Sequence, residues 1–428
     1  MSDRRFAFDT LCLHAGQIPD AATGARALPI YQTTSFVFDS ADHAASLFNL
    51  QTFGNVYSRI SNPTVAALEE RVAALEGGRA ALAAATGMAA QMVALLTLAR
   101  NGEHIVAART LYGGTYSQLA VTFEQMGIAT TFVDGDDPQQ FAAAIRPETR
   151  ALYTETIGNP QLDVADIAAL ASIARAAGVP LVVDNTMASP YLCRPFEHGA
   201  DIVVHSATKY LGGHGTTMGG VLVESGRFPW DNGKFPQMTE PSRGYHGVRF
   251  YETFGDFGFT MKARMETMRT LGPTLSPMSA FLLLQGVETL HLRMPRHSES
   301  ALAVAHHLAA HPKVDWVNYP GLPGSRHRAR AERYLPRGAG GVLTFGVAGG
   351  AAAGVRFIES VQFLSHLANI GDARSLVIHP ASTTHRQLSD DEQRAAGVSP
   401  EMIRLSIGLE ALDDILWDID QALTKAST

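Results

Sequence analysis

A single lysine, Lys209, follows an apolar run and precedes a glycine-rich loop in the stretch DIVVHSATKYLGGHGTTMGG, residues 201–220. A buried lysine tends to lose its proton, and the neutral amine is a nucleophile that can condense with an aldehyde cofactor. The alternative is a lysine that extends from a strand end to water, as an ordinary lysine does. The residues that accompany Lys209 favour the first interpretation.

An aspartate, Asp184, follows a second apolar run in the stretch LVVDNT. Ligands of parallel sheets bind beyond the carboxyl ends of the strands, so we expect Asp184 and Lys209 to face the same site. A carboxylate there can hold a pyridine nitrogen in its protonated form, although an aspartate after a strand can also cap a helix. Together, the lysine and the aspartate point to the chemistry of pyridoxal phosphate.

The phosphate of such a cofactor needs hydrogen-bond donors. Gly87 and Met88, in ATGMAA, lie at a predicted loop-to-helix junction, where free amides and the helix dipole favour an anion. Ser206 and Thr208 add hydroxyl groups beside the lysine, and Tyr112, in LYGGTY, is either a ring that stacks on the cofactor or a core tyrosine. The loop GGHGTTMGG lacks the spacing of nucleotide-binding loops.

Metal binding is not indicated by the sequence. The spacing of His198, His205, His214 and Cys193 matches no common zinc pattern. We therefore expect surface or core roles for these residues and no metal site.

The elements that position these residues alternate along the chain. Apolar runs predict strands at 104–108, 129–134, 150–156, 180–186 and 200–208, and helical patterns at 62–78 and 164–178 end in glycine. This alternation predicts an α/β fold with a mostly parallel sheet covered on both faces. The first sixty residues are predicted to form an extended arm with a strand-like run at 28–38, and a strand at 340–348 and a helix from about 409 belong to a smaller C-terminal part.

Composition narrows the class of protein. The chain has 428 residues, 46% of them hydrophobic, a net charge of −7 and two cysteines. The negative charge argues against nucleic acid or an anionic membrane as a partner, and so few cysteines fit a reducing, cytoplasmic location. Residues 80–99 are uncharged and long enough to span a membrane, but their alanine, glycine and threonine content predicts a buried helix instead.

The stretch DIVVHSATKYLGGHG resembles the cofactor-lysine signature of the pyridoxal-phosphate-dependent enzymes of cysteine and methionine metabolism. YSRISNPT, TGMAA, LYGGTY, ETIGNP, DNT and IRLSIGLE resemble further blocks of that family, in the family's order. The resemblance implies a type I aminotransferase-like fold, with a large cofactor domain and a smaller C-terminal α/β domain. We expect an arm at 1–61 that reaches the neighbouring subunit, the cofactor domain at 62–273 and the C-terminal domain at 274–428.

The resemblance also implies roles for single residues. Lys209 would hold the cofactor and move protons, Asp184 would pair with the ring nitrogen, and Tyr112 would stack on the ring. Further cofactor contacts are implied for Gly87, Met88, Asn159, Ser206 and Thr208, and for Tyr57 and Arg59 of the neighbouring subunit. Arg404 would bind the α-carboxylate of the substrate, and Asn369, where many lyases of the family carry serine, and Tyr57 would line the substrate pocket.

Within the family, residues 10–48, the insertion FPWDNGKFPQMTEP and the stretch ANIGDARSLVIHPAST resemble the O-acetylhomoserine sulfhydrylase branch. That branch converts O-acetylhomoserine and sulfide or methanethiol to homocysteine or methionine and acetate, and its members are dimers with shared sites, usually paired into homotetramers. A γ- or β-lyase of the same family and a non-catalytic phosphate-binding protein are the alternatives. The sequence leaves open which thiol is used and whether an acetyl or a succinyl group departs.

Overall fold

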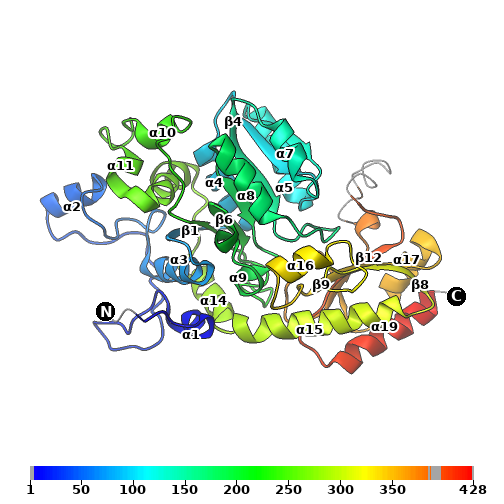
Figure 1. The fold of residues 1–428 in the computed structure, drawn as a ribbon. Coiled ribbons are helices and arrows are strands. Elements are labelled where there is room, and N and C mark those ends of the chain that lie inside the picture. Colours follow the sequence, from blue (N-terminus) through cyan, green and yellow to red (C-terminus); the bar gives the residue numbers. More distant parts are fainter. Residues whose placement is uncertain (1–3, 384–385, 387–396, 427–428) are drawn as a thin grey trace.

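Two β-sheets form the framework of the computed structural model, which describes residues 4–383, 386 and 397–426 (Figure 1). The large sheet has the strand order β1 (Ala80–Ala84), β7 (Gly220–Glu224), β6 (Ile202–Ser206), β5 (Leu181–Asp184), β4 (Thr149–Glu155), β2 (His104–Ala108) and β3 (Ala129–Val133). Strands β2 to β6 are parallel, and β7 is antiparallel to both of its neighbours. The predicted mostly parallel sheet is confirmed.

Helices cover both faces of the large sheet. Helix α3 (Pro63–Glu76) packs on β1 and β7, and helix α4 (Gly87–Leu98) packs on β6 and β7. Successive side chains of a strand point to opposite faces. On β6, His205 contacts α3 while the next residue, Ser206, lies against the start of α4, so the two helices cover opposite faces. The β5–β6 end is thus enclosed from both sides.

Local chemistry defines the limits of these helices. Asn62 caps α3 by accepting the amide proton of Thr64, and Gly77 ends the helix in the left-handed conformation. Thr86 caps α4 by accepting the amide proton of Ala89. The other helices that pack around the large sheet include α5 (Gly113–Ser117), α7 (Pro138–Ala144), α8 (Ile167–Ala177), α9 (Ser189–Leu192), α12 (Gly258–Lys262) and α14 (Pro277–Glu288).

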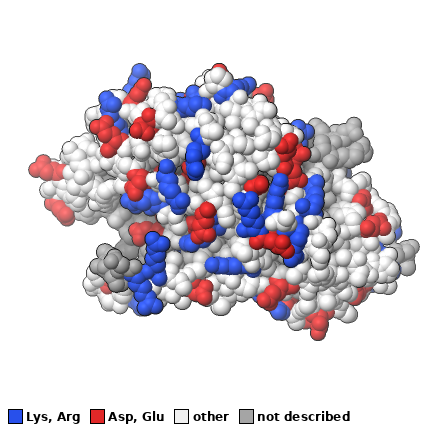
Figure 2. All heavy atoms as spheres, viewed as in Figure 1, with Lys and Arg blue, Asp and Glu red and all other residues white. Residues whose placement is uncertain are grey.

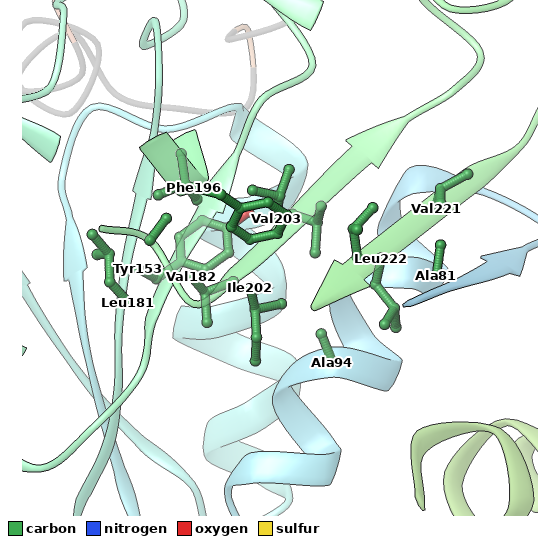
Figure 3. Close-up of a cluster of buried hydrophobic side chains, with 14 of the residues drawn as sticks. Ala81, Ala94, Tyr153, Leu181, Val182, Phe196, Ile202, Val203, Val221 and Leu222 are labelled. Carbon is green, nitrogen blue, oxygen red and sulfur yellow. The ribbon is translucent and has the colours of Figure 1, made fainter. Parts of the chain in front are cut away.

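A continuous apolar core lies between the large sheet and its helices (Figure 3). Val182, Ile202, Val203 and Leu222 are fully buried in it, and Tyr153 is buried among them. Each fully buried side chain of this size stabilises the fold by about 1.5–3 kcal/mol. This core fixes the strand ends that carry the predicted site residues.

The small sheet belongs to the C-terminal part of the chain. Its order is β10 (Ser365–His366), β11 (Leu376–Ile378), β12 (Met402–Ser406), β9 (Val342–Val347) and β8 (Val314–Asn318), with β11, β12, β9 and β8 antiparallel. The long helix α15 (Leu290–Ala309), α16 (Arg328–Tyr334), α17 (Gly350–Ser360) and α19 (Leu412–Ala426) accompany it. The small sheet has a core of its own.

The N-terminal segment is extended, as predicted, with α1 (Phe8–His14) and α2 (Ala41–Phe48) as its helices. The strand-like run at 28–38 is not a strand in the structure, because the only pairing it makes is an isolated bridge between Ser35 and Tyr57. Its aromatic and β-branched residues favour extended backbone, but a strand also needs a neighbour along its length.

The prediction of one buried helix over 80–99 is wrong in part. The run is divided into β1 and α4, because Thr86 and Gly87 form a cap and a helix start in the middle of it. Among the described residues, no helix is long and apolar enough to cross a membrane. On the face drawn in Figure 2, acidic and basic side chains are interspersed, and neither charge sign dominates.

Candidate active site

Lys209 lies in the turn that follows β6 and is half-buried. Its Nζ donates a hydrogen bond to Oδ1 of Asn369 at 2.5 Å, across the space between the two sheets. Burial lowers the pKa of Lys209 to about 8, and the positive charge of Arg404 adds to this effect. The lysine therefore does not extend to water, and more of it is a neutral amine near neutral pH than for an ordinary lysine.

Asp184 is the last residue of β5, and one of its carboxylate oxygens accepts the amide proton of Thr186 at 2.8 Å. It does not cap the helix that follows, because α9 begins after Ala188 without a side-chain cap. Burial raises the pKa of Asp184, while the donors of Thr186 and the nearby His205 oppose the rise. The aspartate is thus a partly buried carboxylate held at a strand end.

Glu155, the last residue of β4, is a site residue that the sequence analysis missed. It pairs in register with Asp184 and is buried. Its Oε1 accepts the amide proton of Tyr112 at 2.7 Å. Burial, followed by the charge of Asp184, raises the pKa of Glu155 well above its usual range. Its position at the end of a predicted strand, in ETIGNP, was the signal available.

An anion cradle is formed where α4 begins against the end of β6. Gly87 and Met88 are the first residues of α4, so their amides have no carbonyl of their own helix to bind. A Cβ at Gly87 would lie 2.6 Å from Cβ of Ser206, so only glycine permits this approach. The Ser206 hydroxyl makes no hydrogen bond within the described part of the chain. Two free amides and a free hydroxyl suit a phosphate.

The Thr208 hydroxyl, unlike that of Ser206, is hydrogen-bonded within the described part of the chain. It donates to the carbonyl of Gly219 at 3.2 Å and accepts the amide proton of Gly219 at 3.1 Å. Thr208 thereby fixes the end of the glycine-rich loop beside Lys209. Its predicted contact with the phosphate stays a prediction.

Tyr112 precedes α5 and is half-exposed, with 51% of its surface accessible, so it is not a core tyrosine. A Cβ at Gly114 would lie 2.5 Å from the Tyr112 ring, which shows that the ring lies over the backbone of Gly114. Glu155 fixes the Tyr112 backbone from the strand side. The ring is therefore held in place with surface left for a planar ligand.

Arg404 projects from β12 of the small sheet and is buried, with 8% of its surface accessible. Its Nη1 donates to Oδ1 of Asn159, in the loop after β4, at 3.1 Å. Among the described residues, no carboxylate forms an ion pair with it. Burial lowers the pKa of Arg404 to about 10. A buried cation without an anion is costly, and a ligand carboxylate would remove that cost.

Tyr57 and Arg59 are exposed and lie apart from this cluster. The Arg59 guanidinium lies 5.3 Å from the centre of the Tyr57 ring. Within the described part of the chain, neither side chain forms a hydrogen bond or an ion pair. The structure therefore presents both residues outward.

One group of three possible metal ligands occurs among the described residues: Asp136, Asp163 and His327. Arg330 donates to Asp136 at 2.7 Å, and Arg326 donates to Asp163 at 2.9 Å. These guanidinium groups already neutralise the carboxylates and would repel a cation. The group is an ion-pair network between the loops of the large sheet and the start of α16.

The residues present fit pyridoxal phosphate. Lys209 offers an amine with a lowered pKa for the aldehyde, and Asp184 offers a partly buried carboxylate for the ring nitrogen. Because Gly87 has no side chain, the space beside Ser206 that a Cβ would fill is left open for the phosphate.

Comparisons with known proteins agree with this geometry. The sequence profile of the family described as Cys/Met metabolism PLP-dependent enzyme matches residues 9–424. The chain is 55% identical to an O-acetyl-L-homoserine sulfhydrylase of Leptospira meyeri, over 98% of this chain and 97% of the relative. It is 49% identical to a homocysteine/cysteine synthase of Saccharomyces cerevisiae, over 97% of each chain.

A solved structure shares the fold. It is a crystal structure of an O-acetylhomoserine (thiol)-lyase from Campylobacter jejuni that contains a pyridoxyl-lysine monophosphate. The two chains superpose with a TM-score of 0.95 at 39% identity, over 98% of this chain and 100% of the other.

Proposed function

Because the chain belongs to the pyridoxal-phosphate-dependent enzymes of cysteine and methionine metabolism, we propose that it uses the site around Lys209 to convert O-acetyl-L-homoserine and sulfide to L-homocysteine and acetate. The bond between the γ-carbon and the ester oxygen breaks, and a bond between the γ-carbon and sulfur forms. The enzyme is thus a transferase that uses pyridoxal phosphate, and methanethiol in place of sulfide would give methionine.

The observation that carries the substrate class is the buried, unpaired guanidinium of Arg404. It suits the α-carboxylate of an amino acid, which accepts two parallel hydrogen bonds from a guanidinium. Asn159 holds the guanidinium from the large sheet, so a carboxylate bound there lies between the two sheets.

Lys209 is the group that moves protons. Its lowered pKa makes the neutral amine available, and it lies close enough to Arg404 for the arginine charge to lower its pKa. A base near the bound α-carbon can take the α-proton and then a β-proton. Pyridoxal phosphate, when bound, supplies the electron sink for the charge that these proton removals leave. Asp184 would hold the ring nitrogen, Tyr112 would cover the ring, and Gly87, Met88 and Ser206 would bind the phosphate.

The test of the proposed function is a competition of reactions in purified protein. We expect homocysteine formation from O-acetylhomoserine and sulfide to be far faster than breakdown of methionine or cystathionine. The same assay with O-succinylhomoserine identifies the leaving group. If methionine breakdown to a keto acid is the faster reaction, the protein is a lyase of the same family instead.

We also infer that two copies of the chain share each site and that dimers pair into a homotetramer. Tyr57 and Arg59 point outward without polar partners, and the arm around them exposes apolar side chains such as Val37 (97% accessible) and Phe53 (75%). A partner surface would cover these groups. The cytoplasm stays the expected compartment, and both cysteines are free thiols.

Mixed subunits test the shared site. Arg59→Ala and Lys209→Ala should each be nearly inactive. When the two variants are unfolded, mixed and reassembled, part of the activity should return, because some sites then contain both intact residues. Hybrids that form but stay inactive would place Arg59 in its own subunit's site or outside it.

A further inference from the structure

A buried arginine of α15 contacts the turn that carries Lys209. Arg293 lies in the first turn of this helix, and 5% of its surface is accessible. Its Nη1 donates to the carbonyl of Tyr210 at 2.9 Å, and its Nη2 donates to the carbonyl of Leu211 at 3.4 Å. These are the two residues that follow Lys209 in the chain. The mechanism derived above gives Arg293 no part.

The other hydrogen bonds of Arg293 join this turn to the end of α14. Its Nη2 also donates to the carbonyl of Gly286 at 2.7 Å, and its Nε donates to the hydroxyl of Thr289 at 3.1 Å. No carboxylate in the described part of the chain forms an ion pair with Arg293, although a buried cation is costly. Its planar fork can reach several carbonyl oxygens at fixed positions, which an apolar side chain or a compact ammonium cannot do. The arginine is therefore suited to hold the turn in place.

The backbone of the turn fits closely around the guanidinium. Gly213 has a φ of +69°, and a Cβ there would lie 2.2 Å from Nη1 of Arg293. The amide of Gly213 donates to the carbonyl of Lys209 at 2.7 Å. The turn can therefore close beside the arginine only because residue 213 has no side chain.

The same face of α15 also contacts the strand of Arg404. Residues four apart lie on one face of a helix, and His297 is four residues after Arg293. His297 donates from Nδ1 to the carbonyl of Ile407, just after β12, at 2.6 Å, and its ring meets the Tyr210 ring edge-on, with 5.3 Å between their centres. The helix then continues to the small sheet, where it packs on β8 and β9 (Figure 1). One helix thus contacts both the lysine turn and the arginine strand.

We propose that Arg293 is a positioning residue for Lys209: its guanidinium fixes the two carbonyls after the lysine, and α15 thereby holds the amine at a set place relative to the strand of Arg404. This inference rests on the proposed function, since it takes the amine of Lys209 to be the group that joins the cofactor.

The joining of pyridoxal phosphate to Lys209 tests the inference without an activity assay. Arg293→Lys keeps the positive charge but loses the planar fork, so it cannot hold the three carbonyl oxygens together. At saturating cofactor, the rate constant for joining should fall by about ten- to a hundredfold, because a misplacement of about 1 Å can slow a reaction about a hundredfold. Stopped-flow absorbance of apoprotein mixed with pyridoxal phosphate measures this rate constant.

A cofactor analogue separates the position of the lysine from general damage to the site. Pyridoxine 5′-phosphate has an alcohol in place of the aldehyde, so it can occupy the site but cannot join to an amine. Its dissociation constant, measured by calorimetry, should not change in Arg293→Lys, because the residues proposed to bind the ring and the phosphate are not bonded to Arg293.

Arg296→Lys is the matched control. Arg296 lies on the same helix and also donates to a carbonyl, that of Glu410 at 3.1 Å, but its side chain is exposed and contacts no residue of the lysine turn. This variant should leave the rate of joining and the affinity for the analogue unchanged.

An unchanged rate of joining in Arg293→Lys, or a loss of affinity for the analogue as large as the loss of rate, would overturn the inference. If Arg293→Lys does not fold, Thr289→Val takes its place. It removes the hydroxyl that orients Nε and should slow joining by about two- to tenfold, as for loss of one hydrogen bond. An unchanged rate in that variant would also overturn the inference. A wild-type protein in which Lys209 does not join the cofactor would instead contradict the proposed function.

Discussion

The two sheets contribute to the site in different ways. The large sheet places Asp184 and Lys209 at or just beyond the carboxyl ends of β5 and β6, where parallel strands bring distant parts of the chain together. The small sheet contributes Arg404 from the middle of β12, paired in register with Thr344 of β9. The side chain of Arg404, in the middle of a strand, is buried by neighbouring side chains. Its positive charge therefore needs a negatively charged partner that the strand itself does not supply. In the proposed function, the large sheet therefore provides the residues for the cofactor, and the small sheet provides the arginine that would select an amino acid.

The largest effect is expected from replacing the lysine of the large-sheet site. Lys209→Ala should abolish turnover and leave a folded protein, because no other amine lies in the cluster. The visible absorption of the variant should no longer be that of a cofactor joined to lysine. Activity and absorbance spectra are the measurements, with Lys234→Ala, in the long loop before α10, as the control. Turnover at the wild-type rate would refute the assignment of the whole site.

Removing the charge at the end of β5 should have the next largest effect. Asp184→Asn should lower kcat by orders of magnitude, since an amide cannot stabilise a protonated ring nitrogen. Steady-state kinetics with O-acetylhomoserine and sulfide check this. A mild effect would reduce Asp184 to a residue that only fixes the turn at Thr186.

Arg404→Lys tests the contribution of the small sheet, because it keeps the charge but loses the paired hydrogen bonds. We expect kcat/KM to fall by about ten- to a hundredfold, as for loss of a charge-assisted hydrogen bond. The affinity for pyridoxal phosphate should not change, because the cofactor contacts come from the large sheet. Arg356→Lys, on α17, is the control. A large loss of cofactor affinity would show that the two sheets do not divide the work in this way.

The smallest expected effect concerns the stability of the apoprotein. The pKa of Lys209 in the folded chain is about 8, below its usual value of 10.5, because burial and Arg404 disfavour the ammonium. The folded state therefore carries the full cost of that charge below pH 8, and the cost disappears as the pH rises through 10.5.

Lys209→Met should accordingly raise the melting temperature by a few degrees at pH 7, with a gain that shrinks toward pH 10.5. Thermal unfolding of the apoproteins across that range measures it, with Lys313→Met as the control. A gain that grows with pH would mean that the ammonium is stabilised, not strained, by its surroundings.

Sequence patterns were sufficient for the five parallel strands of the large sheet and insufficient for β1, β7 and parts of the site. Each predicted strand from 104–108 to 200–208 is present, because a fully buried parallel strand is a short, continuous apolar run. Glu155 was missed because an acidic residue after a strand is common, and only its register beside Asp184 makes it unusual. The sequence also did not indicate that Arg404 is buried, since a polar residue in an alternating strand is ordinarily on the solvent face.

The hydrogen bond between Glu76, the last residue of α3, and His205 of β6 illustrates a second limit. The two residues are 129 positions apart, and their contact depends on how α3 lies against the sheet. Periodicity shows that a helix has a buried face, but it does not identify the strand residue that meets its last turn. Sequence therefore predicts the elements well and the side-chain pairs between them poorly.

The unpaired guanidinium of Arg404 has a practical consequence for work with this enzyme. If this buried guanidinium binds the substrate carboxylate as proposed, any small carboxylate that reaches it should gain the same pair of hydrogen bonds as the substrate. Acetate, the product of the reaction, is one of these. Acetate or formate buffers should therefore act as weak competitive inhibitors and should also stabilise the protein against heat, in proportion to their concentration. The choice of buffer anion is thus an experimental variable, and progress curves at high conversion should bend as acetate accumulates.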